Sequence, residues 1–204
     1  MNGPPNGPDP DDIPDDAEEL QETARRAAQL SAGDVEAFKG LFDMYFDRLH
    51  RYALRYLRSS EESQDLVHDV FLRIWRQRRR IGLERDLRSY LYASTRNLAL
   101  DRLKHRKVED RFIERGASAQ AGGENAADST DTVRDLESRE LAASIQQAID
   151  TLPRRQREVL RLRWQQHLSY NEVAEALNIS PKTVAIHLSR AFEHLRRTLP
   201  GLID

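Results

Sequence analysis

The chain has 204 residues, of which 39% are hydrophobic and 32% are charged, and its formal net charge is −2. This length suits one large domain or two small ones, and the composition favours small helical modules with a large polar surface. The absence of cysteine excludes disulfides, thiolate catalysis and cysteine-based zinc sites. No apolar run is long enough to span a membrane and no signal-peptide pattern is present, so we expect a cytoplasmic protein.

The first sixteen residues differ in composition from the rest of the chain. Residues 1–16 are rich in Pro, Gly, Asn and Asp, and the first basic residue is Arg25. So little apolar surface cannot support a core, and a disordered acidic tail is predicted. A helix is expected next, from Ala17 to Leu30, with Ser31-Ala-Gly33 ending it.

Three further helices are predicted between residues 34 and 107. Asp34 suits an N-cap, and Ser59 with Glu62 suits a capping box. Apolar residues recur at spacings of three and four after both caps and again from Leu87 to Lys107, as on the buried face of a helix. Basic residues greatly outnumber acidic ones between Arg73 and Lys107, so charge is segregated within a nearly neutral chain.

Residues 108–132 change character again. Gly, Ala, Ser and acidic residues dominate this stretch, which predicts a flexible acidic linker. Helical periodicity resumes at Val133 and continues to the end of the chain, and no stretch shows the alternation of a β-strand. The predicted fold is therefore all-α, with two small helical modules joined by a flexible linker.

The stretch 168–190 predicts two helices joined by a tight turn. Ser169 and Glu172 form a capping box, Ser180 is a good N-cap, and Pro181 suits the first position of a helix. This arrangement is typical of a helix-turn-helix motif, whose second helix enters the major groove of DNA. The alternative is an ordinary helical hairpin within a bundle.

The second helix of this motif carries candidate DNA contacts near its N-terminus. Lys182 and Arg190 suit phosphates, while Thr183 and His187 suit base edges. Ser180 and the N–H groups beside it suit a phosphate at the helix N-terminus. Ile186 suits a thymine methyl group, or alternatively completes the core.

A basic run with interleaved aromatic residues lies at the end of the first module. Flat rings can stack on unpaired bases while cations follow the backbone, and an Asn side chain offers a donor and an acceptor to a base edge. The alternative is a pair of half-buried tyrosines beside a solvated charged face. The candidate residues are Arg88, Tyr90, Tyr92, Arg96, Asn97, Arg102, Lys104 and Arg106.

The helix around residues 64–75 combines acidic and apolar residues. Asp65 and Asp69, with neighbouring apolar groups, suit contact with a partner helix, but the same pattern suits a plain core helix. We assign no catalytic residue, metal site or cofactor, because the six histidines are scattered and no glycine-rich phosphate loop occurs. The chain is therefore predicted not to be an enzyme.

Four segments in this order resemble the extracytoplasmic-function (ECF) sigma factors, a class of the sigma-70 family of bacterial transcription initiation factors. The resemblance covers about residues 31–107 and 150–197. The segments that carry it are Ser31-Ala-Gly-Asp-Val-Glu-Ala-Phe38, Asp65 to Trp75 in the manner of region 2.2, Ser89 to Lys104 in the manner of regions 2.3 and 2.4, and Leu152 to Val159 with the helix-turn-helix in the manner of region 4.

The resemblance implies a role for each module. Region 2 (residues 17–107) would bind core RNA polymerase at the beta-prime clamp and recognise the minus-ten promoter element, with Asn97 near a pocket for a flipped base. Region 4 (residues 133–204) would contact the beta flap and read the minus-thirty-five element. An anti-sigma factor is an expected further partner. The implied clamp contacts are Asp65, Leu66, Asp69, Phe71 and Arg73.

The chain departs from the family pattern at several positions. Tyr90 stands where Trp is usual and His68 where Gln is usual, and Ala185 and His187 replace common cations. Asn178 replaces a turn glycine, which is tolerable because Asn accepts left-handed geometry. A stand-alone helix-turn-helix regulator is the alternative function, and a protein-binding helical adaptor is a second one.

Overall fold

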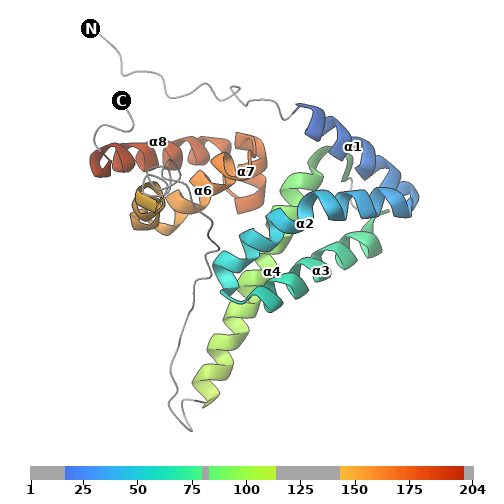
Figure 1. Cartoon of the computed structure of the whole chain (residues 1–204), viewed down its shortest axis with the longest axis horizontal. Helices are drawn as coiled ribbons and strands as arrows, with labels where there is room; N and C mark the ends of the chain where they lie inside the picture. The colour runs from blue at the N-terminus through green and yellow to red at the C-terminus, as the bar shows by residue number, and fades with distance from the viewer. Residues whose placement is uncertain (1–16, 80–82, 114–142, 200–204) are drawn as a thin grey trace, which may run out of the picture. The chain divides into compact units, whose positions relative to one another are not determined.

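The computed structural model describes residues 17–79, 83–113 and 143–199 of the chain. Within these ranges all regular secondary structure is helical, so the predicted all-α class is confirmed (Figure 1). The chain divides into two compact units, of which one contains α1 to α4 and the other α6 to α8. The tail at residues 1–16 and most of the expected linker lie outside the described residues.

The first unit consists of four helices, α1 (Ala17–Ala32), α2 (Val35–Leu57), α3 (Ser60–Gln77) and α4 (Leu83–Ile113). α2 packs against the other three and lies at the centre of the unit. One stripe of α2 at helical spacing is fully buried. Its members are Ala37, Leu41, Tyr45, Leu49, Tyr52 and Ala53.

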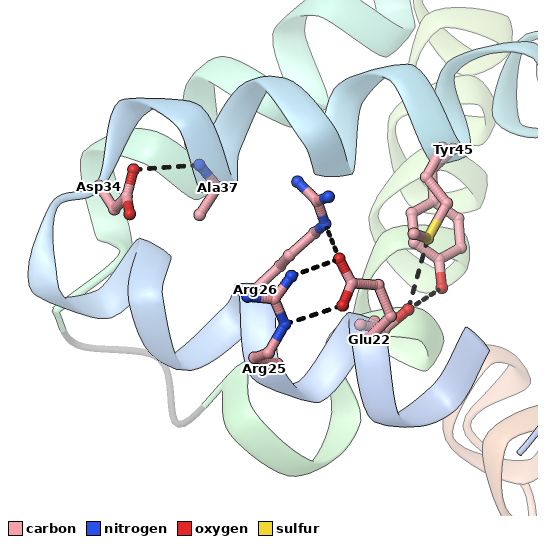
Figure 2. A network of polar contacts seen from close by, with 8 residues as sticks. Glu22, Arg25, Arg26, Asp34, Ala37 and Tyr45 are labelled. Carbon is pink, nitrogen blue, oxygen red and sulfur yellow. Dashed lines mark hydrogen bonds and ion pairs between the residues drawn. The ribbon is translucent and has the colours of Figure 1, made fainter. Parts of the chain in front are cut away.

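The connection from α1 to α2 is fixed by backbone geometry. Gly33 adopts a φ of 96°, which favours glycine, and the N–H groups of Gly33 and Asp34 donate to the carbonyls of Leu30 and Gln29. This is a Schellman ending. The Asp34 carboxylate then accepts from the N–H groups of Glu36 and Ala37, as the sequence predicted for an N-cap. Figure 2 shows the contact with Ala37.

α1 is tied to α2 by polar contacts as well as by burial. The hydroxyl groups of Thr23 and Tyr45 lie 2.8 Å apart in a buried hydrogen bond. Arg48 pairs with Glu19 on the same side of the helix pair.

Figure 2 shows Glu22 between Arg25 and Arg26, whose hydrogen bonds lower the pKa of Glu22 to about 2.

α4 is longer than the sequence predicted. It begins at Leu83 rather than near Leu87 and runs to Ile113, beyond Lys107, where we expected the linker to begin. The added segments contain neither Gly nor Pro, so the backbone meets no residue that would stop a helix until Gly116.

The second unit contains a helical segment at 143–151 followed by α6 (Arg154–Trp164), α7 (Tyr170–Leu177) and α8 (Pro181–Thr198). α8 packs against both α6 and α7. The interior is mainly aliphatic, and Glu158, Arg163 and Gln166 are also buried. Its buried residues include Leu152, Val159, Leu162, Val173, Leu177, Val184, Leu188 and Ala191.

Candidate nucleic-acid interface

The turn between α7 and α8 has the geometry that the sequence predicted. Ser169 and Glu172 form both hydrogen bonds of a capping box at the start of α7. Asn178 ends the helix in the left-handed region, with φ 52° and ψ 55°. The N–H groups of Asn178 and Ile179 close a Schellman motif on Glu175 and Ala174.

The N-terminus of α8 is capped by one serine side chain. The Ser180 hydroxyl oxygen accepts a hydrogen bond from the N–H of Thr183 and lies 2.8 Å from the Thr183 hydroxyl. Pro181 occupies the first turn, where its missing N–H costs nothing. The cap therefore orders the first turn of α8, where both Ser180 and Lys182 are exposed.

The candidate contacts on α8 lie mainly on its outer face. Lys182, Ile186 and Arg190 are exposed, whereas Val184 and Leu188 point into the core. Ile186 keeps 42% of its surface exposed, so it does not complete the core, which was the alternative. The exposed face therefore combines two cations with one branched apolar side chain.

His187 is half-buried among positive charges on the same face. Its burial and the charges of Arg155 and Arg190 lower the pKa of His187. The charge of Arg155 thus acts on α8 although the residue belongs to α6, where it pairs with the buried Glu158 at 3.2 Å. Sequence reasoning did not name Arg155 as a candidate contact, although the segment from Leu152 to Val159 that contains it was grouped with the helix-turn-helix; its proximity to His187 arises only from tertiary packing.

The outer face of α4 gathers part of the predicted basic and aromatic run. Asn97 and Lys104 are exposed, seven residues apart, and Tyr90 and Arg96 are half-buried. The Tyr90 hydroxyl donates to Gln77 of α3 at 3.4 Å. Tyr90, Asn97 and Lys104 follow one another at two-turn intervals and therefore share one side of the helix.

Two residues of the same run lie inside the unit, which corrects their assignment as direct DNA contacts. Tyr92 has no exposed surface and packs edge-on against Tyr52, with ring centroids 5.3 Å apart. Arg88 is only 3% exposed. Burial raises the pKa of Tyr92 and raises that of Tyr45 to about 12, while the charge of Arg88 opposes both shifts.

Two further cations of the run are engaged by α3. Arg102 donates to the carbonyl oxygen of Glu62 and to the carboxylate of Asp69, both at 2.7 Å. Arg106 pairs with the Glu62 carboxylate. The sequence predicted a capping box between Ser59 and Glu62. The Ser59 hydroxyl makes its half by accepting from the N–H of Glu62, whereas the Glu62 carboxylate pairs with Arg106.

The candidate polymerase contacts on α3 fall on two sides of the helix. Asp65, Asp69 and Arg73 are exposed. Leu66 and Phe71 are buried, which corrects their assignment as contacts, because Phe71 packs edge-on against Phe42 with ring centroids 5.0 Å apart.

One exposed apolar residue of α3 was not among the predicted contacts. Leu72 keeps 49% of its surface exposed. It follows Asp65 and Asp69 by seven and three residues, which places it on their side of the helix. The spacing of three and seven residues from Asp69 and Asp65 is the sequence signal that could have identified Leu72.

Metal binding and membrane insertion each require a recognisable feature in the part of the chain that the structure describes. No group of three or more His, Asp or Glu side chains is placed to hold a metal ion there. Among the same residues, no helix combines the length and apolar character needed to cross a membrane.

Comparisons with known proteins agree with the order of the two units. Residues 41–108 match the model of Sigma-70 region 2, and residues 142–195 match that of Sigma-70, region 4. SigW of Bacillus subtilis, an ECF RNA polymerase sigma factor, is 30% identical over 182 residues, which cover 87% of this chain and 97% of SigW. BldN of Streptomyces coelicolor, another ECF sigma factor, is 30% identical over 91% of this chain and 67% of its own length.

Solved structures share the fold. The sigma factor RpoE of Bartonella quintana, in its complex with the anti-sigma factor NepR, aligns with a TM-score of 0.58 and 20% identity over 82% of this chain and 99% of its own. CnrH, in its complex with the cytosolic domain of CnrY, aligns with a TM-score of 0.57 and 22% identity over 87% of this chain and 97% of its own. By its similarity to SigW along nearly the whole of that protein, the chain belongs to the ECF family of RNA polymerase sigma factors.

Proposed function

We propose that this sigma factor brings core RNA polymerase to its promoters by reading two DNA elements with two separate units. The observation that carries the proposal is the outer face of α8, which exposes Lys182, Ile186 and Arg190 directly after a capped helix-turn-helix turn. The family assignment supports the same role. Residues 17–107 would act as region 2 and residues 133–204 as region 4.

The second unit would read the minus-thirty-five element as duplex DNA. Lys182 and Arg190 would neutralise phosphates, and the capped N-terminus of α8 at Ser180 would face another phosphate. Thr183 and His187 would reach base edges, and Ile186 would meet a thymine methyl group. We add Arg155 of α6 as a phosphate contact, because its side chain is 46% exposed and lies near enough to His187 for its charge to help lower the pKa of that histidine.

The first unit would hold the opened minus-ten element on the outer face of α4. Tyr90 would stack on an unpaired base, and Asn97 would bond to a base edge. Arg96 and Lys104 would follow the backbone. Arg88 and Tyr92 would support this face from the interior, since both side chains are buried.

The exposed side of α3 would bind polymerase. Asp65, Asp69 and Arg73 supply charge, and Leu72 supplies an exposed apolar group between them. Such a mixed stripe suits the surface of a partner helix, and the family resemblance implies the beta-prime clamp of polymerase as that partner. Catalysis of RNA synthesis would belong to polymerase, so we propose that the chain itself is not an enzyme. An anti-sigma factor remains a predicted partner.

Run-off transcription with purified core polymerase tests the proposal. The full chain is expected to associate with core polymerase and to support initiation from genomic promoters that are bound by the complex. Lys182→Ala should reduce initiation, and Lys39→Ala is the matched control, since Lys39 is an exposed lysine of α2 outside both faces. Tight duplex binding without polymerase, together with no initiation, would instead identify a stand-alone regulator.

A further inference from the structure

Two arginines of α4 are tied to α3 where the proposed DNA-binding helix meets the proposed polymerase-binding helix. Arg102 donates from Nη1 to the carbonyl oxygen of Glu62 and from Nη2 to the Asp69 carboxylate, both at 2.7 Å. Arg106, one turn further along α4, pairs with the carboxylate of Glu62. We call these contacts the α3–α4 brace. It joins two cations of the DNA-binding run to two acidic residues of α3.

The two partners in the brace differ in their access to solvent. The Asp69 side chain is 57% exposed, whereas that of Arg102 is 30% exposed. A binding partner can therefore reach the carboxylate from outside. Two of the five N–H groups of Arg102, one from each terminal nitrogen, already donate to α3. The negative charge of Asp69 beside this guanidinium group repels a DNA phosphate, so the phosphate would compete with Asp69 for Arg102.

We propose that the α3–α4 brace is an autoinhibitory contact that holds Arg102 and Arg106 away from promoter DNA until a partner engages Asp69. The proposal rests on the proposed function, because it takes polymerase as that partner. When polymerase binds the Asp69 carboxylate, Arg102 loses its charged partner and turns to the DNA backbone. By reciprocity, DNA that takes Arg102 strengthens the grip of polymerase on Asp69.

The strength of the brace suits a switch. Partly exposed ion pairs contribute little to folding, so the contact can open without unfolding the unit. The same weakness limits the expected effect on DNA binding to about two- to fivefold. Inhibition of this size lowers the affinity of unbound factor for DNA by the same factor, and the effect is absent once polymerase holds Asp69.

The first test measures DNA binding by the full chain without polymerase. The probe is a fluorescent single-stranded oligonucleotide of mixed sequence at low ionic strength, because backbone contacts are independent of sequence. Asp69→Asn should bind about two- to fivefold more tightly than the native chain, since Arg102 is released. Glu61→Gln is the matched control: it removes one negative charge from an exposed residue of α3 outside the brace.

A double-mutant cycle separates release of Arg102 from a general change in charge. In an Arg102→Gln background the gain from Asp69→Asn should disappear, whereas any small effect of Glu61→Gln should stay the same. Glu62→Gln, which removes the partner of Arg106, should also tighten binding. It provides a second route if Asp69→Asn fails to fold by circular dichroism. Equal gains from Asp69→Asn in both backgrounds, or none beyond the Glu61→Gln control, would overturn the brace.

Failure of the brace and failure of the proposed function give different results. A chain that does not associate with core polymerase contradicts the proposed function, whatever its affinity for single-stranded DNA. If the chain associates with core polymerase and supports initiation, but Asp69→Asn leaves its affinity for single-stranded DNA unchanged, only the autoinhibitory contact is contradicted.

Discussion

Asn178 shows how one residue ends the first helix of the helix-turn-helix. It adopts φ 52° and ψ 55°, a region that most residues with a Cβ atom avoid. Asn178→Ala should lower the free energy of unfolding of the second unit by about 1 kcal/mol, because alanine adopts the left-handed conformation less readily than asparagine does. Asn178→Gly should be close to neutral, since glycine accepts it. Urea unfolding of the two variants checks this, and equal losses would contradict it.

His187 makes the second unit sensitive to pH. Its pKa in the folded chain lies below its ordinary value of 6.5, through burial and the charges of Arg155 and Arg190. As the pH falls below about 6.5, the unfolded chain takes up a proton first, so stability is lost until the folded pKa is passed. Over this pH interval the free energy of unfolding of His187→Gln should fall less than that of the native chain, as urea unfolding at several pH values would measure.

The same histidine should couple DNA binding to pH. Nearby phosphates favour the charged imidazole, so DNA should raise the pKa of His187 and bind more tightly as the pH falls. Titrating affinity for minus-thirty-five duplex against pH, with His187→Gln as the control, measures this coupling. A slope that is unchanged in His187→Gln would place the histidine away from the phosphates.

At the scale of the element, α1 is part of the first unit although it lies outside the residues matched by the region 2 model. Leu30 has no exposed surface, whereas Leu20 is 40% exposed. Leu30→Ala should cost about 2–5 kcal/mol, a large share of the stability of a small unit. Leu20→Ala should change it by less than about 0.5 kcal/mol. Thermal unfolding of both variants tests whether α1 belongs to the cooperative unit.

α4 shows which part of an element the sequence predicts and which part it does not. The helix itself was predictable from its residues, but its inward face was not. Ser94 and Thr95 are buried, and the Thr95 hydroxyl donates a hydrogen bond to the carbonyl oxygen of Leu91. Because these inward residues are polar, the inner face of the helix looks like a solvent-exposed face in the sequence. Tyr92 consequently seemed as available to DNA as Tyr90, although residues two apart on a helix face different ways.

The two tyrosines should therefore respond differently to truncation. Tyr90→Ala should weaken binding of opened minus-ten DNA by the polymerase complex by about 1–3 kcal/mol, the value of one stacked base, and leave folding nearly unchanged. Tyr92→Ala should instead cost about 3–5 kcal/mol of stability, because it leaves a cavity in the core. Open-complex assays and thermal unfolding on the same variants distinguish the two losses.

At the scale of the whole molecule, caps, glycine turns and periodicity predicted two helical units and their order, because these signals are local. The α3–α4 brace was not predictable, since Arg102 and Asp69 are 33 residues apart and meet only through tertiary packing. The same reason explains why Arg155 escaped notice. Local signals thus define the elements, whereas contacts between elements decide which charged side chains remain available to DNA.

Because the two proposed DNA-reading faces lie in separate units, their contributions to initiation should be independent. Lys182→Ala in α8 and Tyr90→Ala in α4 should reduce the rate of open-complex formation by free energies that add within about 0.5 kcal/mol in the double variant. The effects of Asp69→Asn and Arg102→Gln should not add, because the two side chains are in contact. Measuring both pairs on one promoter with one polymerase preparation makes each the control of the other. Strong coupling between Lys182 and Tyr90 would mean that the two units read DNA as a single surface.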